Sequence, residues 1–201
     1  MTEITTIEAL EALYGTPGEA SLVKVAHHIT DQYKAWIEAS PFCALATVGP
    51  EGMDCTPRGD HGQVAFIEDP TRVAVPDRRG NNRIDTLRNI VRDPRCAVMF
   101  LIPGSGTVIR VNGRARIVTD QTRLTRYTVQ GAPPRSVILI EVEEVYFQCA
   151  RAVKRARLWD GRDLSNGLPS PGDILQKLTA GGIDGQKYDA DWPERAARSM
   201  W

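Results

Sequence analysis

Seven short strand-like segments between residues 42 and 147 restrict the folds open to this chain more than any other feature. Each is apolar or alternates apolar and polar residues over a few positions, and turn residues such as Gly49-Pro50 separate them. The predicted strands cover residues 42–48, 53–58, 63–67, 72–75, 96–102, 107–118 and 136–147. Because closing a sheet removes exposed strand edges, this succession predicts a mainly β fold, a barrel with flanking helices.

Helical patterns flank and interrupt the strands. From residue 19 to residue 39, apolar side chains recur at three- and four-residue spacing, which predicts one amphipathic helix ending at Ser40-Pro41. Shorter helices are predicted at residues 82–92 and at about 120–130. The length of 201 residues suits one domain. We expect a helical lead (1–40), a barrel core (41–159) and a polar, helical tail (160–201).

Charge and cysteine content narrow the function classes. The chain has 25 basic and 25 acidic residues, and a net charge of zero argues against a general nucleic-acid binder. No targeting segment or membrane span is visible, so we expect a cytoplasmic protein without a membrane partner. The cysteines lack zinc spacing, and Cys43, Cys55 and Cys96 are predicted to be small buried residues. The neighbouring His27 and His28 point about 100° apart on a helix, so no metal site is expected.

Positive charge is concentrated where one predicted strand ends. Between residues 58 and 157 there are 18 basic and 10 acidic residues. The strand ending at Pro76 leads into Asp77 and then into residues 78–83, which we call the basic turn and which carry Arg78, Arg79 and Arg83 before a predicted helix. Arginine forks and unpaired N–H groups at a helix start both bind anions, so the turn predicts a phosphate site. The alternative is an ordinary solvated turn.

Several motifs occur in an order that resembles one known family. The motifs are Thr56-Pro57-Arg58-Gly59-Asp60, Val75-Pro76-Asp77-Arg78 with the following Gly80-Asn81-Asn82-Arg83, Leu87-x-Asn89-Ile90, Ile109-Arg110-Val111-Asn112-Gly113, and Cys149-Ala150-x-Ala152-x-x-Arg155-x-x-Leu158-Trp159. Over roughly residues 37–159 the chain is similar to the pyridoxamine 5′-phosphate oxidase-like flavoproteins, more narrowly to an uncharacterised bacterial subgroup.

This resemblance implies a split β-barrel homodimer that binds one FMN at each of two sites across the subunit interface. It places Arg58, Asn81, Asn82 and Arg83 at the cofactor phosphate, with Arg78 beside them. Arg83 is expected in the first turn of the predicted helix. A doubly charged phosphate needs several fixed donors, which this set can supply.

The resemblance also places residues near the flavin ring. Pro76 and Asp77 lie where the family strand passes the ring. Asp77 either accepts a hydrogen bond from the ring or the ribityl chain, or pairs with Arg78 or Arg79. Arg110, on an otherwise apolar strand, either contacts the flavin or faces outward and pairs with an acid such as Glu141.

A basic segment after the last strand is the other candidate. Lys154, Arg155 and Trp159 either complete the flavin site of the second subunit or form a dimer-interface loop with surface charge. Catalytic residues stay unassigned, although His61 is the one histidine close in sequence to the proposed site.

Together these features predict an FMN-dependent oxidoreductase that acts on an unidentified small molecule, with a nicotinamide as a candidate electron donor. The cofactor performs the electron transfer, and the protein supplies position and electrostatics. Vitamin B6 oxidation is not expected, because the chain lacks the Arg-x-His motif near the carboxyl end of that enzyme. The alternatives are a deazaflavin-dependent reductase and a flavin- or haem-binding protein without turnover.

Overall fold

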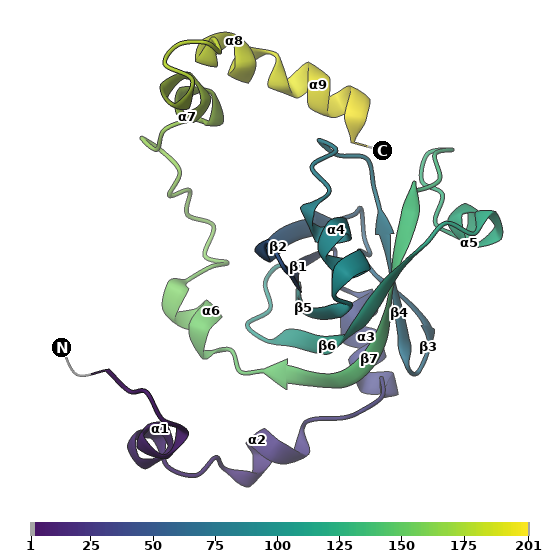
Figure 1. The fold of residues 1–201 in the computed structure, drawn as a ribbon, viewed down its shortest axis with the longest axis vertical. Helices are drawn as coiled ribbons and strands as arrows, with labels where there is room; N and C mark the ends of the chain where they lie inside the picture. The colour runs from purple at the N-terminus through teal and green to yellow at the C-terminus, as the bar shows by residue number, and fades with distance from the viewer. Residues whose placement is uncertain (1–2, 201) are drawn as a thin grey trace.

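The computed structural model describes residues 3–200 and contains one curved, antiparallel sheet (Figure 1). Its seven strands lie in the order β2-β1-β5-β6-β7-β4-β3. In chain order they are β1 (Phe42–Gly49), β2 (Gly52–Gly59), β3 (Phe66–Asp69), β4 (Arg72–Asp77), β5 (Arg95–Leu101), β6 (Val108–Val118) and β7 (Ser136–Gln148). This arrangement confirms the predicted split-barrel fold.

One strand lies later in the chain than predicted. The segment expected at residues 63–67 begins at Phe66, and β3 continues to Asp69. Val64 and Ala65 are buried, but the Val64 N–H donates to the carbonyl of Ser40 at 2.9 Å. These apolar residues therefore fill the core from a connecting segment, outside the ladder of the sheet.

Nine helices lie within the described residues. They are α1 (Ile7–Tyr14), α2 (Glu19–Val23), α3 (Asp31–Glu38), α4 (Asp85–Arg92), α5 (Gln121–Arg126), α6 (Arg151–Ala156), α7 (Pro171–Leu178), α8 (Gly185–Ala190) and α9 (Trp192–Ser199). Two are shorter than predicted, since α4 starts at Asp85 and α5 ends at Arg126. None of the helices in residues 3–200 is long and apolar enough to cross a membrane.

The single helix predicted over residues 19–39 is wrong. Residues 24–30 separate α2 from α3, and Ala26 exchanges backbone hydrogen bonds with Val145 of β7 at 3.0 and 2.8 Å. The N–H of Ile29 donates to Pro70, and Thr30 caps α3. Bonding to a distant strand therefore overrides the helical spacing of the apolar residues.

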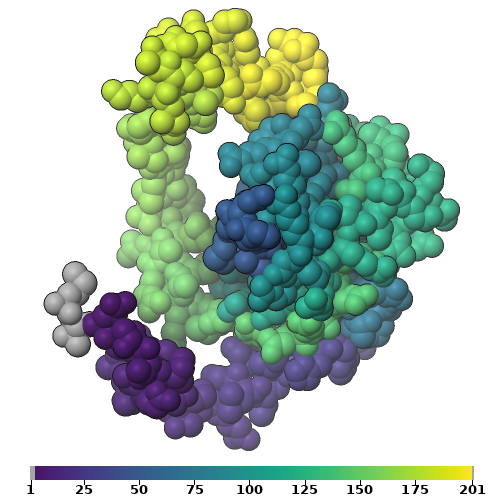
Figure 2. Space-filling model, viewed as in Figure 1, coloured from purple at the N-terminus to yellow at the C-terminus, as the bar shows by residue number. Residues whose placement is uncertain are grey.

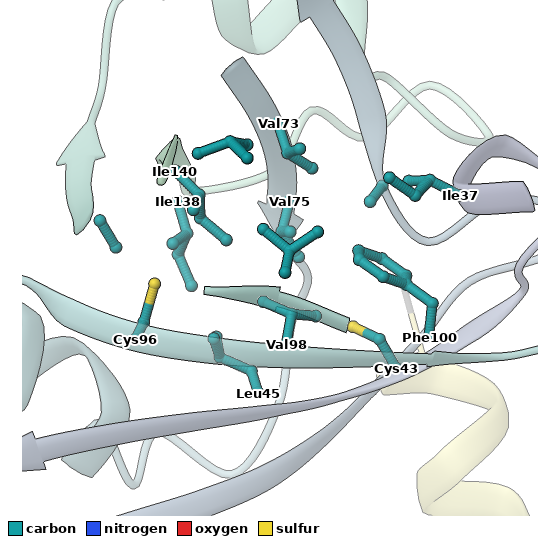
Figure 3. Packing of buried hydrophobic residues seen from close by; sticks show 14 of the residues in the cluster. Ile37, Cys43, Leu45, Val73, Val75, Cys96, Val98, Phe100, Ile138 and Ile140 are labelled. Carbon is teal, nitrogen blue, oxygen red and sulfur yellow. The ribbon is translucent and has the colours of Figure 1, made fainter. Parts of the chain in front are cut away.

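The core lies between the two halves of the curved sheet. Figure 3 shows Val75 of β4, Val98 and Phe100 of β5, and Ile138 of β7 pointing toward one another, with Ile37 of α3 at one side. Each of these side chains is at most 1% exposed. Such packing fixes the strands whose ends form the candidate site.

Two of the three cysteines predicted to be buried lie in this core. Burial raises the pKa of the Cys43 thiol and of the Cys96 thiol to about 12. The prediction is wrong for Cys55, which is exposed. The reason is its position on β2, an edge strand where alternate side chains face outward.

The two ends of the chain extend away from the barrel. Figure 2 shows the C-terminal helices arching beside it, with a gap between the arch and the barrel. Helices α7 and α8 pack closely, because a Cβ built on Gly172 would lie 2.1 Å from the carbonyl oxygen of Gly185. The C-terminal helices thus form a compact unit, which an extended segment connects to α6 (Figure 1).

Candidate functional site

Two ion pairs join the ends of strands that are not neighbours in the sheet. Arg58, at the end of β2, pairs with Asp77, at the end of β4. Close by, Arg78 Nε donates to Asp60 Oδ2 at 2.7 Å. Because β2 is one edge and β4 adjoins the opposite edge strand, these pairs close one end of the barrel. We call the four residues the ionic clamp.

The clamp is largely shielded from water. The side chains of Arg58 and Asp77 are 19% and 16% exposed, and those of Arg78 and Asp60 are less exposed still. Asp77 thus forms an ion pair with Arg58, a partner that was not predicted from the sequence. Within residues 3–200, the buried Arg58 Nε has no hydrogen-bond partner. An unsatisfied buried donor is uncommon and requires an explanation.

A second layer of contacts fixes Arg78. Its Nη1 donates to the backbone carbonyl of Tyr127, just after α5. The hydroxyl of Tyr127 donates to Glu68 at 2.9 Å, and its ring lies 4.8 Å from that of Phe66. Burial and the neighbouring carboxylate of Glu68 raise the pKa of Tyr127 to about 12, so this hydroxyl remains a donor. Arg78 is therefore held in one orientation.

The asparagines of the basic turn shape its backbone. Asn81 Oδ1 accepts from the N–H of Arg83 at 3.0 Å, and Asn82 adopts a left-handed φ of 61°, which asparagine tolerates better than most residues. Asn81, Asn82 and Arg83 belong to this turn, and α4 begins only at Asp85. The prediction that Arg83 lies in the first turn of the helix is therefore wrong. Arg83 instead pairs with Asp85, and its side chain is 80% exposed.

The basic turn borders a small cavity of about 110 Å³. It is lined by Arg78, Arg79, Ala132, Pro133, Pro134 and Arg135, and we call it the arginine cavity. Arg135 Nη1 donates to Asn82 Oδ1 at 2.7 Å, which ties the loop before β7 to the basic turn. Arg135 was not among the site residues predicted from the sequence. The sequence shows Arg135 just before a predicted strand. It does not show that Ser136 pairs with Asp77, the contact that brings Arg135 to the basic turn.

Arg110 and the segment after β7 make their contacts outside the basic turn. The Arg110 guanidinium lies 5.1 Å from the centre of the Tyr146 ring, and Glu141 pairs with Arg116, so the suggested pair of Arg110 with Glu141 is wrong. Trp159 Nε1 donates to the carbonyl of Ser105 at 2.7 Å. Figure 1 places α6, which carries Lys154 and Arg155, well apart from the basic turn of the same chain.

Neither a metal site nor a catalytic histidine emerges from the described residues. Between residues 3 and 200 no group of three or more His, Cys, Asp or Glu side chains could hold a metal ion. His61 is exposed, and its backbone N–H donates to Asp60. The site is therefore built of arginines, of the carboxylates that pair with two of them, and of asparagines. The guanidinium and amide N–H groups of this set are donors that can bind an anion.

Comparison with known proteins decides the family. A family model described as pyridoxamine 5′-phosphate oxidase matches residues 29–149, more than half of the chain. The chain belongs to this family. The match includes the whole sheet, the ionic clamp and the arginine cavity. Lys154, Arg155 and Trp159 lie beyond it.

Several solved structures are similar to part of this chain at low sequence identity. HupZ of Group A Streptococcus, in a histidine-to-alanine variant, is 19% identical, with a TM-score of 0.50 over 60% of this chain and 99% of that one. A candidate pyridoxamine 5′-phosphate oxidase from Lactobacillus delbrueckii is 20% identical, with a TM-score of 0.48 over 60% and 95%. An F420 reductase is 20% identical, with a TM-score of 0.43 over 60% and 98%. No curated protein matches the sequence.

Proposed function

We propose that this member of the pyridoxamine 5′-phosphate oxidase family is an FMN-dependent oxidoreductase that acts on a small organic molecule. The observation that carries the proposal is the family match over a barrel whose one end is lined by arginines. The flavin supplies hydride or electron transfer, and the protein supplies its position and surroundings. Pyridoxamine phosphate oxidation is not proposed, because the chain lacks the Arg-x-His motif.

The residues at this end of the barrel suit a phosphorylated flavin. Arg58, Asn81, Asn82 and Arg83 would hold the phosphate, with Arg78 fixed beside them. The buried Arg58 Nε, which has no partner in the described chain, supports this assignment because a ligand oxygen would satisfy it. The donors belong to an arginine fork and to amides, which suit phosphate oxygens.

Three further sets of residues would complete the site. Pro76 and Asp77 would lie along the ring, where the pairing of Asp77 with Arg58 restrains the carboxylate. Arg110 would contact the flavin from β6. Lys154, Arg155 and Trp159 would come from the second copy of the chain, because α6 lies apart from the basic turn of its own chain (Figure 1).

A homodimer is supported by surfaces that a single chain leaves uncovered. Six outward side chains of the paired strands β1 and β5 form an apolar patch: Phe42, Ala44, Ala46, Ala97, Met99 and Leu101. A sheet face that meets water normally carries polar residues, so this patch suits burial against another copy. Of the 23 exposed large apolar side chains within residues 3–200, seven lie in residues 4–23 and nine in residues 158–200. The terminal helices thus also have apolar surface to bury.

Cofactor extraction tests the proposed function. The purified protein is denatured, the released small molecules are identified by mass spectrometry, and dye reduction is measured with each nicotinamide nucleotide. FMN, together with nicotinamide-dependent dye reduction, is the expected result. A deazaflavin would instead indicate the deazaflavin-dependent alternative. Haem, or FMN with no turnover by either donor, would indicate a binding protein and contradict the enzyme proposal.

A further inference from the structure

We propose that helix α1 of each chain binds the surface around α6 of a second copy, so that two copies exchange their N-terminal segments. We call residues 3–23 the acidic arm and residues 151–157 the basic segment. The proposal rests on the homodimer of the proposed function and identifies a surface that joins its two chains. Both segments lie outside the family match, which covers residues 29–149.

The two segments carry opposite charges that their own chain does not neutralise. The acidic arm contains Glu3, Glu8, Glu11 and Glu19 and no basic residue. The basic segment contains three arginines and one lysine and no acidic residue. None of these charged side chains forms an ion pair with any residue in the described range 3–200. The segments are therefore complementary in charge, which favours and orients the association of two surfaces.

Helix α1 also lacks a packing partner in its own chain. Isolated helices shorter than about 12–15 residues are marginal in water, and α1 has 8 residues. None of them is buried, although Ile7, Leu10 and Leu13 recur at three-residue spacing on one side of the helix. These three side chains are 40–66% exposed. Contact with another copy would cover this apolar side and stabilise the helix.

The basic segment offers a surface that matches α1. No residue of α6 is buried, and Leu158, which directly follows the segment, is 50% exposed. The proposed function assigns Lys154 and Arg155 to the cofactor. The exposed Arg151 and Arg157 therefore remain for the carboxylates of α1, while Leu158 would pack against its apolar side.

Both segments leave the barrel from the same strand. Ala26 exchanges backbone hydrogen bonds with Val145 of β7, and Lys24 Nζ lies 5.0 Å from the centre of the Phe147 ring. The same strand leads into α6, and Figure 1 shows α1 and α6 on one side of the barrel. Neither helix buries a residue within one chain. In a two-fold dimer each copy would present one α1 and one basic segment at this side, so the contact would form twice.

Two charge-reversed variants of the full-length protein test the exchange. One variant carries Glu8→Lys and Glu11→Lys, and the other carries Arg151→Glu and Arg157→Glu. Within either variant the reversed side chains meet charges of their own sign. In a mixed dimer each α1 meets arginines or glutamates of opposite sign on the partner, so both contacts are restored. Mixing therefore restores the contact only if it joins two chains.

Native mass spectrometry of the co-produced variants counts the mixed dimers. Random pairing of equal amounts makes about half of the dimers mixed. We expect about four-fifths or more, because two attractive contacts replace two repulsive ones. The matched control replaces the second variant by Arg126→Glu with Arg198→Glu, exposed residues of α5 and α9 that give the same net charge. The control should leave about half of the dimers mixed, since distant surface charges are screened by salt.

Hydrogen exchange of α1 provides a second measurement. The amides of residues 7–14 should exchange about tenfold or more slowly in the wild type than in the variant with Arg151→Glu and Arg157→Glu, because docking protects the helix. The sequence of α1 is the same in both proteins, so a difference must come from the basic segment.

Three outcomes would overturn the inference: monomers alone, mixed dimers no more frequent than in the control, or equal exchange of α1 in both proteins. Dimers that carry FMN but show either of the last two results leave the proposed function standing. Enriched mixed dimers without any flavin support the exchange and refute the proposed function alone.

Discussion

Replacement of Asp77 by asparagine is expected to destabilise the barrel by about 2–3 kcal/mol. The change keeps the size of the side chain but leaves the Arg58 guanidinium without its counter-charge. Breaking a fully buried pair costs about 3–5 kcal/mol, and an exposed pair contributes under about 1 kcal/mol. Because both side chains are more than four-fifths covered, the expected value lies toward the buried limit.

Urea unfolding of the cofactor-free protein measures this cost. A loss of about 2–3 kcal/mol corresponds to a Tm lower by roughly 4–12 °C for a chain of this length. A double-mutant cycle with Arg58→Gln isolates the pair, and we expect a coupling energy of about 1 kcal/mol or more. The control is Glu194→Gln, whose partner Arg198 is 72% exposed and which should cost under about 0.5 kcal/mol.

Two outcomes would contradict a stabilising role for the pair of Arg58 and Asp77. One is a destabilisation for Asp77→Asn no larger than that of Glu194→Gln. The other is a coupling energy near zero, which would show that the two side chains act independently. Either result would mean that the ionic clamp does not hold β2 against β4.

Three further predictions concern thiols, pH and assembly. A disulfide reagent added to the native protein should label Cys55 and Cys149 but not the two core thiols, and Cys149 should react faster because the neighbouring Arg151 N–H lowers its pKa. The raised pKa of Tyr127 means that the folded chain holds this proton more tightly than the unfolded chain, so its contribution to stability is complete below pH 10 and is lost between about pH 10 and 12. Unfolding measured against pH should show this loss in the wild type and a smaller one in Tyr127→Phe. Met99→Glu should convert dimers to monomers by light scattering, whereas Val91→Glu, at an exposed apolar residue on α4, should not.

The strands were predictable because their signal is local. Residues 42–48 and 96–102 are apolar runs bounded by turns, and they form β1 and β5 with nearly the predicted ends. The helix predicted over residues 19–39 failed because Ala26 bonds to Val145, more than a hundred residues away. Helical spacing in a short window does not record such a partner.

The candidate site was likewise predictable only in part. The basic turn was found from its composition, but the partners of its arginines were not. Arg58 lies 19 residues from Asp77, and Arg135 lies 53 residues from Asn82. These contacts exist only once the barrel is closed, so sequence alone shows where charge is concentrated and not which carboxylate neutralises it.

Native mass spectrometry of the protein as purified tests the proposed flavin-binding homodimer, because one spectrum reports both the number of chains and the bound cofactor. We expect a complex of two chains and two FMN molecules. A single chain that retains FMN, or a dimer that carries a cofactor other than a phosphorylated flavin, would contradict it.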